Sequence, residues 1–220
     1  MSKTYIVGDI HGCYYTLLDV LKIIKETKEE DDTLIFLGDY FDRGNFNAEV
    51  YYLLRKLQEE YKENIILLRG NHEQMQLEAI RQREKECLWF SNGGYRTAED
   101  FTEAQISSFN VEKWIKTMPY AYYDKDLDIY CVHSYLPHRA IEDFDKDELK
   151  DCIWKREKSE VGKKVFHGHT PHKGIIFQNN DINLDTGCVF GGGLTFATIG
   201  KNCMSIITIP TNEKDKVNLI

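Results

Sequence analysis

The chain has 220 residues, 42% of them hydrophobic, and a formal net charge of −8. This composition predicts one folded domain over residues 1–220 and excludes a disordered chain. The negative charge argues against binding to nucleic acid backbones. Because the sequence holds no apolar run of about 18 residues, a membrane span is not expected.

The first seventy residues alternate short apolar strands with amphipathic helices. Strands are predicted at residues 4–7, 33–37 and 64–68. Apolar residues at helical spacing predict helices over residues 14–27 and 47–61, the second with Asn47 as its N-cap. This β-α-β-α-β order predicts parallel strands whose carboxyl ends share one edge of a sheet, where ligands bind in open α/β sheets.

Each of these three strands leads into a glycine-containing motif. The motifs are GDIHG at residues 8–12, GDYFDRG at residues 38–44 and GNHE at residues 70–73. They contain candidate oxygen and nitrogen ligands for divalent metals, and no thiolate. These candidates are Asp9, His11, Asp39 and Asn71. Two ions roughly 3.5–4 Å apart need a bridging carboxylate, which we expect to be Asp39.

Two further histidines follow apolar runs later in the chain. His133 comes after a predicted strand at residues 127–132, and His169 lies in a Gly-rich turn after a strand at residues 164–167. Both are candidate nitrogen ligands of the second ion. His167 competes with His169, which is preferred because it lies outside the apolar strand. The set predicts a two-metal hydrolase of phosphate esters.

Two arginines and a histidine–aspartate pair complete the candidate site. Arg43 lies inside the second motif, and its planar guanidinium suits a phosphate group. Arg156 could bind phosphate as well, or could form a surface ion pair with nearby glutamates. His72 could act as general acid with Asp42 orienting its ring, and a structural His–Asp hydrogen bond is the alternative.

The rest of the chain is predicted from its patterning alone. Residues 74–118 are expected to form a helical insertion beside the site, and residues 175–209 an antiparallel meander. The last ten residues, 211–220, are expected to be loosely held. The six cysteines form no Cys-x-x-Cys pair, and no signal peptide is evident, so we expect reduced thiols in a cytoplasmic protein.

The three motifs resemble those of the phosphoprotein phosphatase family of metallophosphoesterases, especially its bacteriophage lambda-type branch. The likeness extends through WKRE at residues 154–157, GHTP at 168–171 and DTGCVF at 185–190. It implies an α/β calcineurin-like metallophosphoesterase fold, with a central β-sandwich of two mixed sheets flanked by α-helices. It also implies two divalent ions, with Mn²⁺ expected and iron, zinc, nickel and magnesium as alternatives.

The resemblance further implies roles for the candidate residues. One ion would take Asp9, His11 and Asp39, and the other would take Asp39, Asn71, His133 and His169. Arg43 and Arg156 would hold the phosphate, and His72, supported by Asp42, would protonate the leaving oxygen.

The implied function is a metal-dependent phosphomonoesterase using in-line attack of a metal-bridging hydroxide. A serine/threonine protein phosphatase is expected, with phosphotyrosine as a further substrate class to test. The expected partners are a phosphorylated protein or peptide or a small phosphate ester, and no regulatory subunit is evident.

The alternatives on the same metal core are a symmetrical diadenosine tetraphosphate hydrolase and a polynucleotide end phosphatase. A nucleoside needs an aromatic platform, which Trp89, Phe90 and Tyr95 could supply, although they could equally belong to the core. A non-catalytic binding module is disfavoured because all six candidate ligands and both arginines are present.

Overall fold

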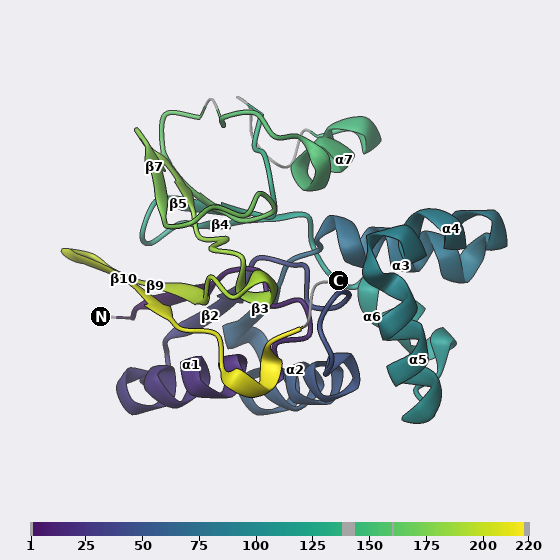
Figure 1. The fold of residues 1–220 in the computed structure, drawn as a ribbon. Coiled ribbons are helices and arrows are strands. Elements are labelled where there is room, and N and C mark those ends of the chain that lie inside the picture. Colours follow the sequence, from purple (N-terminus) through teal and green to yellow (C-terminus); the bar gives the residue numbers. More distant parts are fainter. Residues whose placement is uncertain (1, 138–143, 160, 218–220) are drawn as a thin grey trace.

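The structure, a computed structural model, describes residues 2–137, 144–159 and 161–217. Two five-stranded sheets stack face to face between layers of helices (Figure 1). The first sheet contains, in spatial order, β10 (Cys203–Ile209), β9 (Leu194–Gly200), β1 (Thr4–Val7), β2 (Thr33–Phe36) and β3 (Ile65–Leu67). The second contains β4 (Ala121–Asp124), β5 (Ile129–Val132), β6 (Lys164–His167), β8 (Asp181–Asn183) and β7 (Ile176–Gln178). The predicted β-sandwich of two mixed sheets is confirmed.

The helices form three groups around the sandwich (Figure 1). Helices α1 (Tyr14–Thr27) and α2 (Asn47–Tyr61) cover the outer face of the first sheet, and α7 (Lys146–Trp154) covers the second. A lateral group contains α3 (Asn71–Arg81), α4 (Glu86–Trp89), α5 (Tyr95–Glu103) and α6 (Ser108–Lys116). The short helical segments are η1 (Lys62–Asn64), η2 (Arg83–Lys85), η3 (Phe90–Gly94), η5 (Cys188–Phe190) and η6 (Glu213–Asp215). None of the helices described is both long and apolar enough to cross a membrane.

The central strands β1 and β2 of the first sheet are buried on both faces, whereas β10 at its edge is largely exposed. Tyr5 and Val7 of β1 face α1 and α2, whereas Ile6 lies in the core between the sheets with Phe166 and Ile182. Successive side chains of a strand point to opposite faces, so a strand covered on both sides must be apolar throughout. All six cysteines are free, and four of them are buried.

The pairing of the strands places several of their carboxyl ends on one edge. Strand β2 pairs in parallel with both β1 and β3, as predicted from the β-α-β-α-β order. In the second sheet β5 and β6 are also parallel. The expected antiparallel meander is only partly correct. Its two antiparallel pairs, β7–β8 and β9–β10, form but lie in different sheets, and β8 pairs in parallel with β6.

Two expectations about chain ends and caps were wrong. Helix α2 begins at Asn47 itself, with Phe46 as its N-cap, and the Asn47 amide instead accepts a hydrogen bond from the Asp42 N–H at 2.9 Å. The segment after residue 210 is not loose up to residue 217. The Asp215 carboxylate is buried and accepts hydrogen bonds from the N–H groups of Tyr15 and Thr16, so it caps α1. Residues 218–220 lie outside the described chain.

Candidate metal centre

The predicted metal-binding residues meet where the carboxyl ends of the two sheets adjoin. They come from the segments that follow β1, β2, β3, β5 and β6. All six side chains are buried, with exposed fractions of 8% or less. They are Asp9, His11, Asp39, Asn71, His133 and His169.

Asp39 lies between two groups of potential ligands. Its Oδ2 is 3.5 Å from His11 Nε2, and its Oδ1 is 3.4 Å from His133 Nε2. One compact group contains His11, Asp39 and His72, and the other contains Asp39, His133 and His169. Each carboxylate oxygen therefore faces a different group, which is the arrangement that a bridging ligand needs.

Asn71 and Asp9 extend these two groups. Asn71 Oδ1 lies 3.0 Å from His133 Nε2 and 2.9 Å from His169 Nδ1, so the amide belongs with the second group. Asp9 Oδ2 accepts a hydrogen bond from the His169 backbone N–H at 3.0 Å. Asp9 Oδ1 is buried and has no hydrogen-bond partner. A buried carboxylate oxygen without a partner is costly, and a cation would satisfy it.

Backbone carbonyl groups orient two of the imidazoles. His11 Nδ1 lies 2.7 Å from the Phe41 carbonyl oxygen, and His133 Nδ1 lies 2.9 Å from that of Leu37. An Nδ1–H that donates to a carbonyl leaves the Nε2 lone pair free for a metal. In both residues Nε2 is the atom that faces Asp39.

The backbone of the site is held in an uncommon conformation. His11, Asp39 and His169 have φ values of 47°, 53° and 70°, and Asp42 and Arg43 have 72° and 69°. Residues other than glycine rarely adopt this left-handed region, and its energetic cost must be met by the surrounding contacts. All five residues lie in the turns that carry the candidate site, so the surrounding contacts must hold these turns in this conformation.

Close packing explains two of the glycines. A Cβ atom on Gly38 would lie 2.6 Å from the Gly70 nitrogen, and Gly38 has a φ of 107°. A Cβ atom on Gly168 would lie 1.9 Å from Asp9 Oδ1. Any side chain at these positions would push the ligand-bearing turns apart.

Glu73 organises two of these turns, a role that sequence reasoning missed. The carboxylate is fully buried and accepts hydrogen bonds from the backbone N–H groups of Asp39, Tyr40 and Gly70 at 2.8–2.9 Å. Burial and the nearby charge of Asp39 raise the pKa of Glu73 to about 7. The only sign of this role in the sequence is the position of Glu73 in the GNHE motif. Its hydrogen bonds to Asp39 and Tyr40 join α3 to a distant turn, and local sequence patterns do not reveal such contacts.

His72 is fixed by a buried polar network. Its Nδ1 lies 2.6 Å from Asp42 Oδ2, and Asp42 also accepts hydrogen bonds from Trp89 Nε1 at 2.9 Å and Thr97 Oγ1 at 2.5 Å. Sequence reasoning found the His72–Asp42 pair but gave Trp89 and Thr97 no part in holding it. Trp89 is 6% exposed, so its ring offers no platform for a nucleoside.

The arginines lie at the two ends of the centre. Arg43 donates from Nη1 to His11 Nε2 at 2.6 Å and from Nη2 to His72 Nε2 at 2.8 Å. Arg156 is exposed, and its Nε lies 3.3 Å from His169 Nε2. No ion pair of Arg156 is present among the described residues. His167 points away from the centre, with its Nε2 3.5 Å from Asp181 Oδ1.

Crowded carboxylates and imidazoles shift one another's pKa values. Burial and the charge of Asp185 raise the pKa of Asp9 well above its usual range. Burial raises the pKa of Asp185, which sequence reasoning did not select, to about 6. Burial alone would raise the pKa of Asp39 too, but His133 and His72 hold it well below its usual value. Several buried anions in one place favour a site for cations.

These observations together fit a centre for two divalent cations. The donor set consists of carboxylate and amide oxygens and imidazole nitrogens, which hard and borderline divalent ions accept. One carboxylate is shared, a second has an unpartnered buried oxygen, and the outer hydrogen bonds orient the rings.

Known proteins share both the sequence and the fold. Residues 2–196 match the calcineurin-like phosphoesterase family. "Serine/threonine-protein phosphatase 1" of Salmonella typhimurium is 31% identical over 216 residues, which cover 89% of this chain and 91% of the relative. "Serine/threonine-protein phosphatase SIT4" of Candida albicans is 39% identical over a shorter stretch of 89 residues, covering 40% of this chain and 28% of the relative.

Solved structures of other proteins share the fold of this chain. A crystal structure assigned provisionally as a diadenosine tetraphosphatase superposes with a TM-score of 0.71 at 25% identity, covering 96% of this chain and 95% of the other. A Saccharomyces cerevisiae serine/threonine phosphatase superposes with a TM-score of 0.66 at 20% identity, covering 89% and 72%. With residues 2–196 matched by the family and the expected sandwich in place, this chain belongs to the calcineurin-like phosphoesterase family.

Proposed function

We propose that this chain is a metal-dependent serine/threonine protein phosphatase that hydrolyses phosphomonoesters at the metal centre. The observation that carries the proposal is Asp39, whose two oxygens face two ligand groups beside Arg43 and the His72–Asp42 pair. The Salmonella typhimurium relative, named as a serine/threonine phosphatase, matches over most of both chains.

Two divalent cations held by these residues would supply positive charge to the phosphoryl group and lower the pKa of a water molecule. Arg43 lies against His11 and His72, where its guanidinium can hold two phosphoryl oxygens. Arg156 lies beside His169 and can bind the same group from the other end. His72, with Nδ1 fixed by Asp42, can deliver a proton from Nε2 to the leaving oxygen.

We propose manganese as the native ion. Carboxylate and amide oxygens suit manganese, while the imidazoles are compatible with iron, zinc and nickel as well. Elemental analysis of protein purified without added metal tests this directly. Magnesium or zinc as the bound ion, with full activity, would contradict it.

The test of function is turnover on matched substrates. Manganese-loaded protein is compared with chelator-treated protein on phosphoserine, phosphothreonine and phosphotyrosine peptides and on diadenosine tetraphosphate. Metal-dependent release of phosphate from the phosphoserine and phosphothreonine peptides, with little dinucleotide cleavage, is expected. Cleavage of the dinucleotide with no release from the peptides would overturn the proposal.

A symmetrical diadenosine tetraphosphate hydrolase is the second candidate. It is supported by the 25% identical structural relative that bears a similar assignment. Phe90 and Tyr95 are 38% and 45% exposed and could contact a nucleobase, unlike the buried Trp89. The dinucleotide arm of the same assay decides between the two candidates.

A further inference from the structure

A polar cavity of about 220 Å³ lies beside the metal centre. It is bounded by the segment between α7 and β6 and by the β7–β8 hairpin. Its lining includes Arg156, Lys158, His167, His172, Asp181 and Asn183. We call it the flanking pocket. Apart from Arg156, none of these residues has a role in the chemistry proposed above.

The flanking pocket is continuous with the metal centre at Arg156. That residue lines the pocket, and its Nε lies 3.3 Å from the ligand candidate His169. Gly168, also in the lining, packs directly against Asp9. A substrate whose phosphoryl group is held by Arg156 therefore has the flanking pocket within reach of its neighbouring atoms.

The floor of the flanking pocket carries an unsatisfied acceptor. Asp181 is 5% exposed, and its Oδ2 accepts a hydrogen bond from the Ser159 N–H at 2.9 Å. Its Oδ1 is buried without a hydrogen-bond partner and lies 3.5 Å from His167 Nε2. Such an oxygen favours a ligand that brings a donor, such as an amide N–H.

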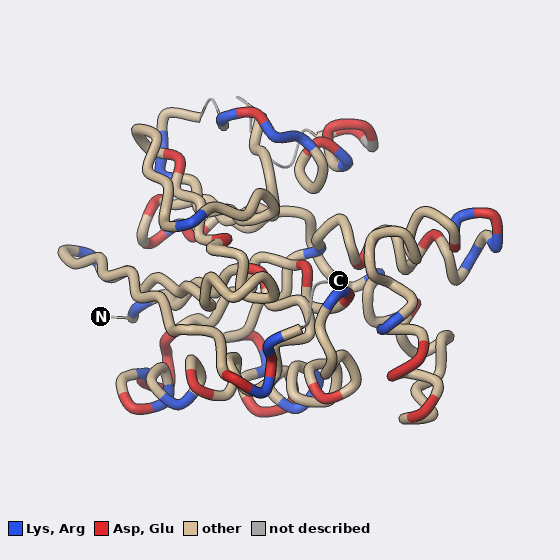
Figure 2. The backbone as a smooth tube through the Cα atoms, viewed as in Figure 1, with Lys and Arg blue, Asp and Glu red and all other residues tan. Residues whose placement is uncertain are grey.

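The rim of the flanking pocket is positively charged. In Figure 2, the backbone between α7 and β6 carries several positions coloured as Lys or Arg, in a chain of net charge −8. Lys155 is paired with Glu157 at 3.2 Å, whereas Lys158 is exposed and has no ion pair among the described residues. Together with Arg156, Lys158 can attract an acidic group at the rim.

The lining favours a peptide over a nucleoside. None of the described residues that line the flanking pocket is Phe, Tyr or Trp, so it offers no broad aromatic face for a base to stack on. The acceptor at the floor matches the N–H of a peptide backbone. The basic rim matches an acidic side chain on the same peptide. We infer that the flanking pocket binds the acidic residues beside the phosphorylated residue of a protein substrate, which rests on the proposed phosphatase function.

The test compares three phosphothreonine peptides that differ only in their flanking residues. One carries glutamates on the amino side of the phosphothreonine, one on the carboxyl side, and one carries alanines on both sides. We expect kcat/KM of the manganese-loaded enzyme to be about threefold higher for one acidic peptide than for the alanine peptide, as expected for an exposed charge pair. Because exposed charges are screened, this preference should shrink in added salt.

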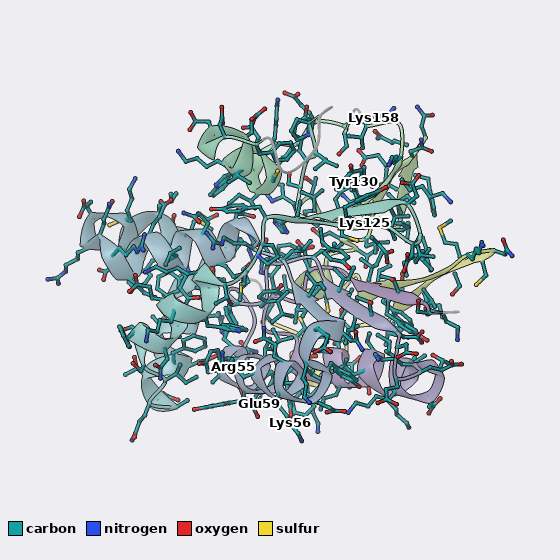
Figure 3. All side chains as sticks on the ribbon, turned by 180° about the vertical axis from the view of Figure 1, so that it is seen from behind. Arg55, Lys56, Glu59, Lys125, Tyr130 and Lys158 are labelled. Carbon is teal, nitrogen blue, oxygen red and sulfur yellow. The ribbon has the colours of Figure 1, made fainter. Side chains whose placement is uncertain are left out.

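Charge reversal at the rim provides the decisive variant. Lys158→Glu should abolish or invert the preference while leaving turnover of p-nitrophenyl phosphate unchanged. Lys56→Glu is the matched control, because Lys56 is an exposed lysine of α2 at the opposite end of the molecule (Figure 3). This control should keep the preference of the unmodified enzyme.

The outcomes separate the inference from the proposed function. Equal kcat/KM for all three peptides, or a preference that survives Lys158→Glu, would overturn the inference while the phosphatase function stands. No metal-dependent release from any phosphopeptide would overturn both. Cleavage of diadenosine tetraphosphate that is weakened by Lys158→Glu would assign the flanking pocket to a nucleotide instead.

Discussion

The two sides of the metal centre are held in place in different ways. On one side, His72 is fixed by Asp42, which is itself held by Trp89 and Thr97, and all four residues are buried. On the other side, His169 adjoins the exposed Arg156 and the flanking pocket. We call the side with His72 and Asp42 the braced side, because its buried hydrogen bonds can hold a proton donor at one position. We call the side with His169 and Arg156 the open side, because it can admit the chain of a substrate.

The shared residue Asp39 should be the most sensitive position, because it serves both sides. Asp39→Asn removes the charge between the two groups, and turnover is expected to fall by about a thousandfold or more. An asparagine oxygen can still accept the hydrogen bond from the His72 N–H, so the fold should persist. Metal content and thermal unfolding are measured together. Retention of both ions would show that Asp39 is not the shared ligand.

His72→Asn tests the braced side. A general acid contributes on the order of a hundredfold to ten-thousandfold, so loss of that size is expected on phosphoserine peptides. The loss should be smaller on p-nitrophenyl phosphate, whose leaving group needs no proton, and metal content should not change. Equal losses on both substrates would argue against His72 as the acid. Because His72 Nε2 also lies 3.9 Å from Asp39 Oδ2, loss of an ion would instead identify it as a ligand.

Glu73→Gln tests the turns that both sides share. A glutamine amide presents one NH₂ group to three backbone donors, so the turns carrying Asp39 and Gly70 should shift. We expect metal affinity to weaken by about ten- to hundredfold, the range for residues that position ligands. Metal titration measures this, with the exposed Glu84→Gln as control. Unchanged affinity would limit Glu73 to a structural role.

Trp89→Phe should have the smallest effect and should be confined to the braced side. It keeps an aromatic ring but removes the hydrogen bond from Nε1 to Asp42. A hydrogen bond to a charged group is worth about 1.5–3 kcal/mol. Because Asp42 keeps its contacts with Thr97 and His72, we expect the lower end of this range, a fall of about tenfold in turnover of phosphoserine peptides. The exposed Trp154→Phe is the matched control. A drop in metal affinity, with kcat preserved, would contradict a role restricted to Asp42.

Local patterns were sufficient for the elements up to residue 61. The predicted bounds of β1, α1 and α2 agree with the structure because apolar spacing within each segment specifies its buried face. The turns after β1 to β3 could be placed together because parallel strands share an edge. The candidate site residues that lie in these turns could therefore be predicted from the sequence.

Contacts between distant segments could not be read from the sequence in the same way. The amide of Asn47 supports the Asp42 turn, and the indole of Trp89 reaches Asp42 from the lateral helices. A hydrogen-bonding side chain near a helix start looks the same whether it caps that helix or supports another turn. The parallel pairing of β8 with β6 was missed for a similar reason, because sequence alternation does not specify which neighbour a strand takes.

The capping of α1 by Asp215 has a consequence for how the chain matures during synthesis. Helix α1 begins three residues after His11, and within the described chain the N–H groups of Tyr15 and Thr16 are satisfied by the Asp215 carboxylate alone. Strand β1 likewise obtains its antiparallel neighbour, β9, only once residue 200 has been made. While the chain on the ribosome is still shorter than this, it contains Asp9 and His11 but lacks the contacts made by β9 and Asp215. The turn that carries Asp9 and His11 can therefore gain its full set of supporting contacts only after residue 215 has been made.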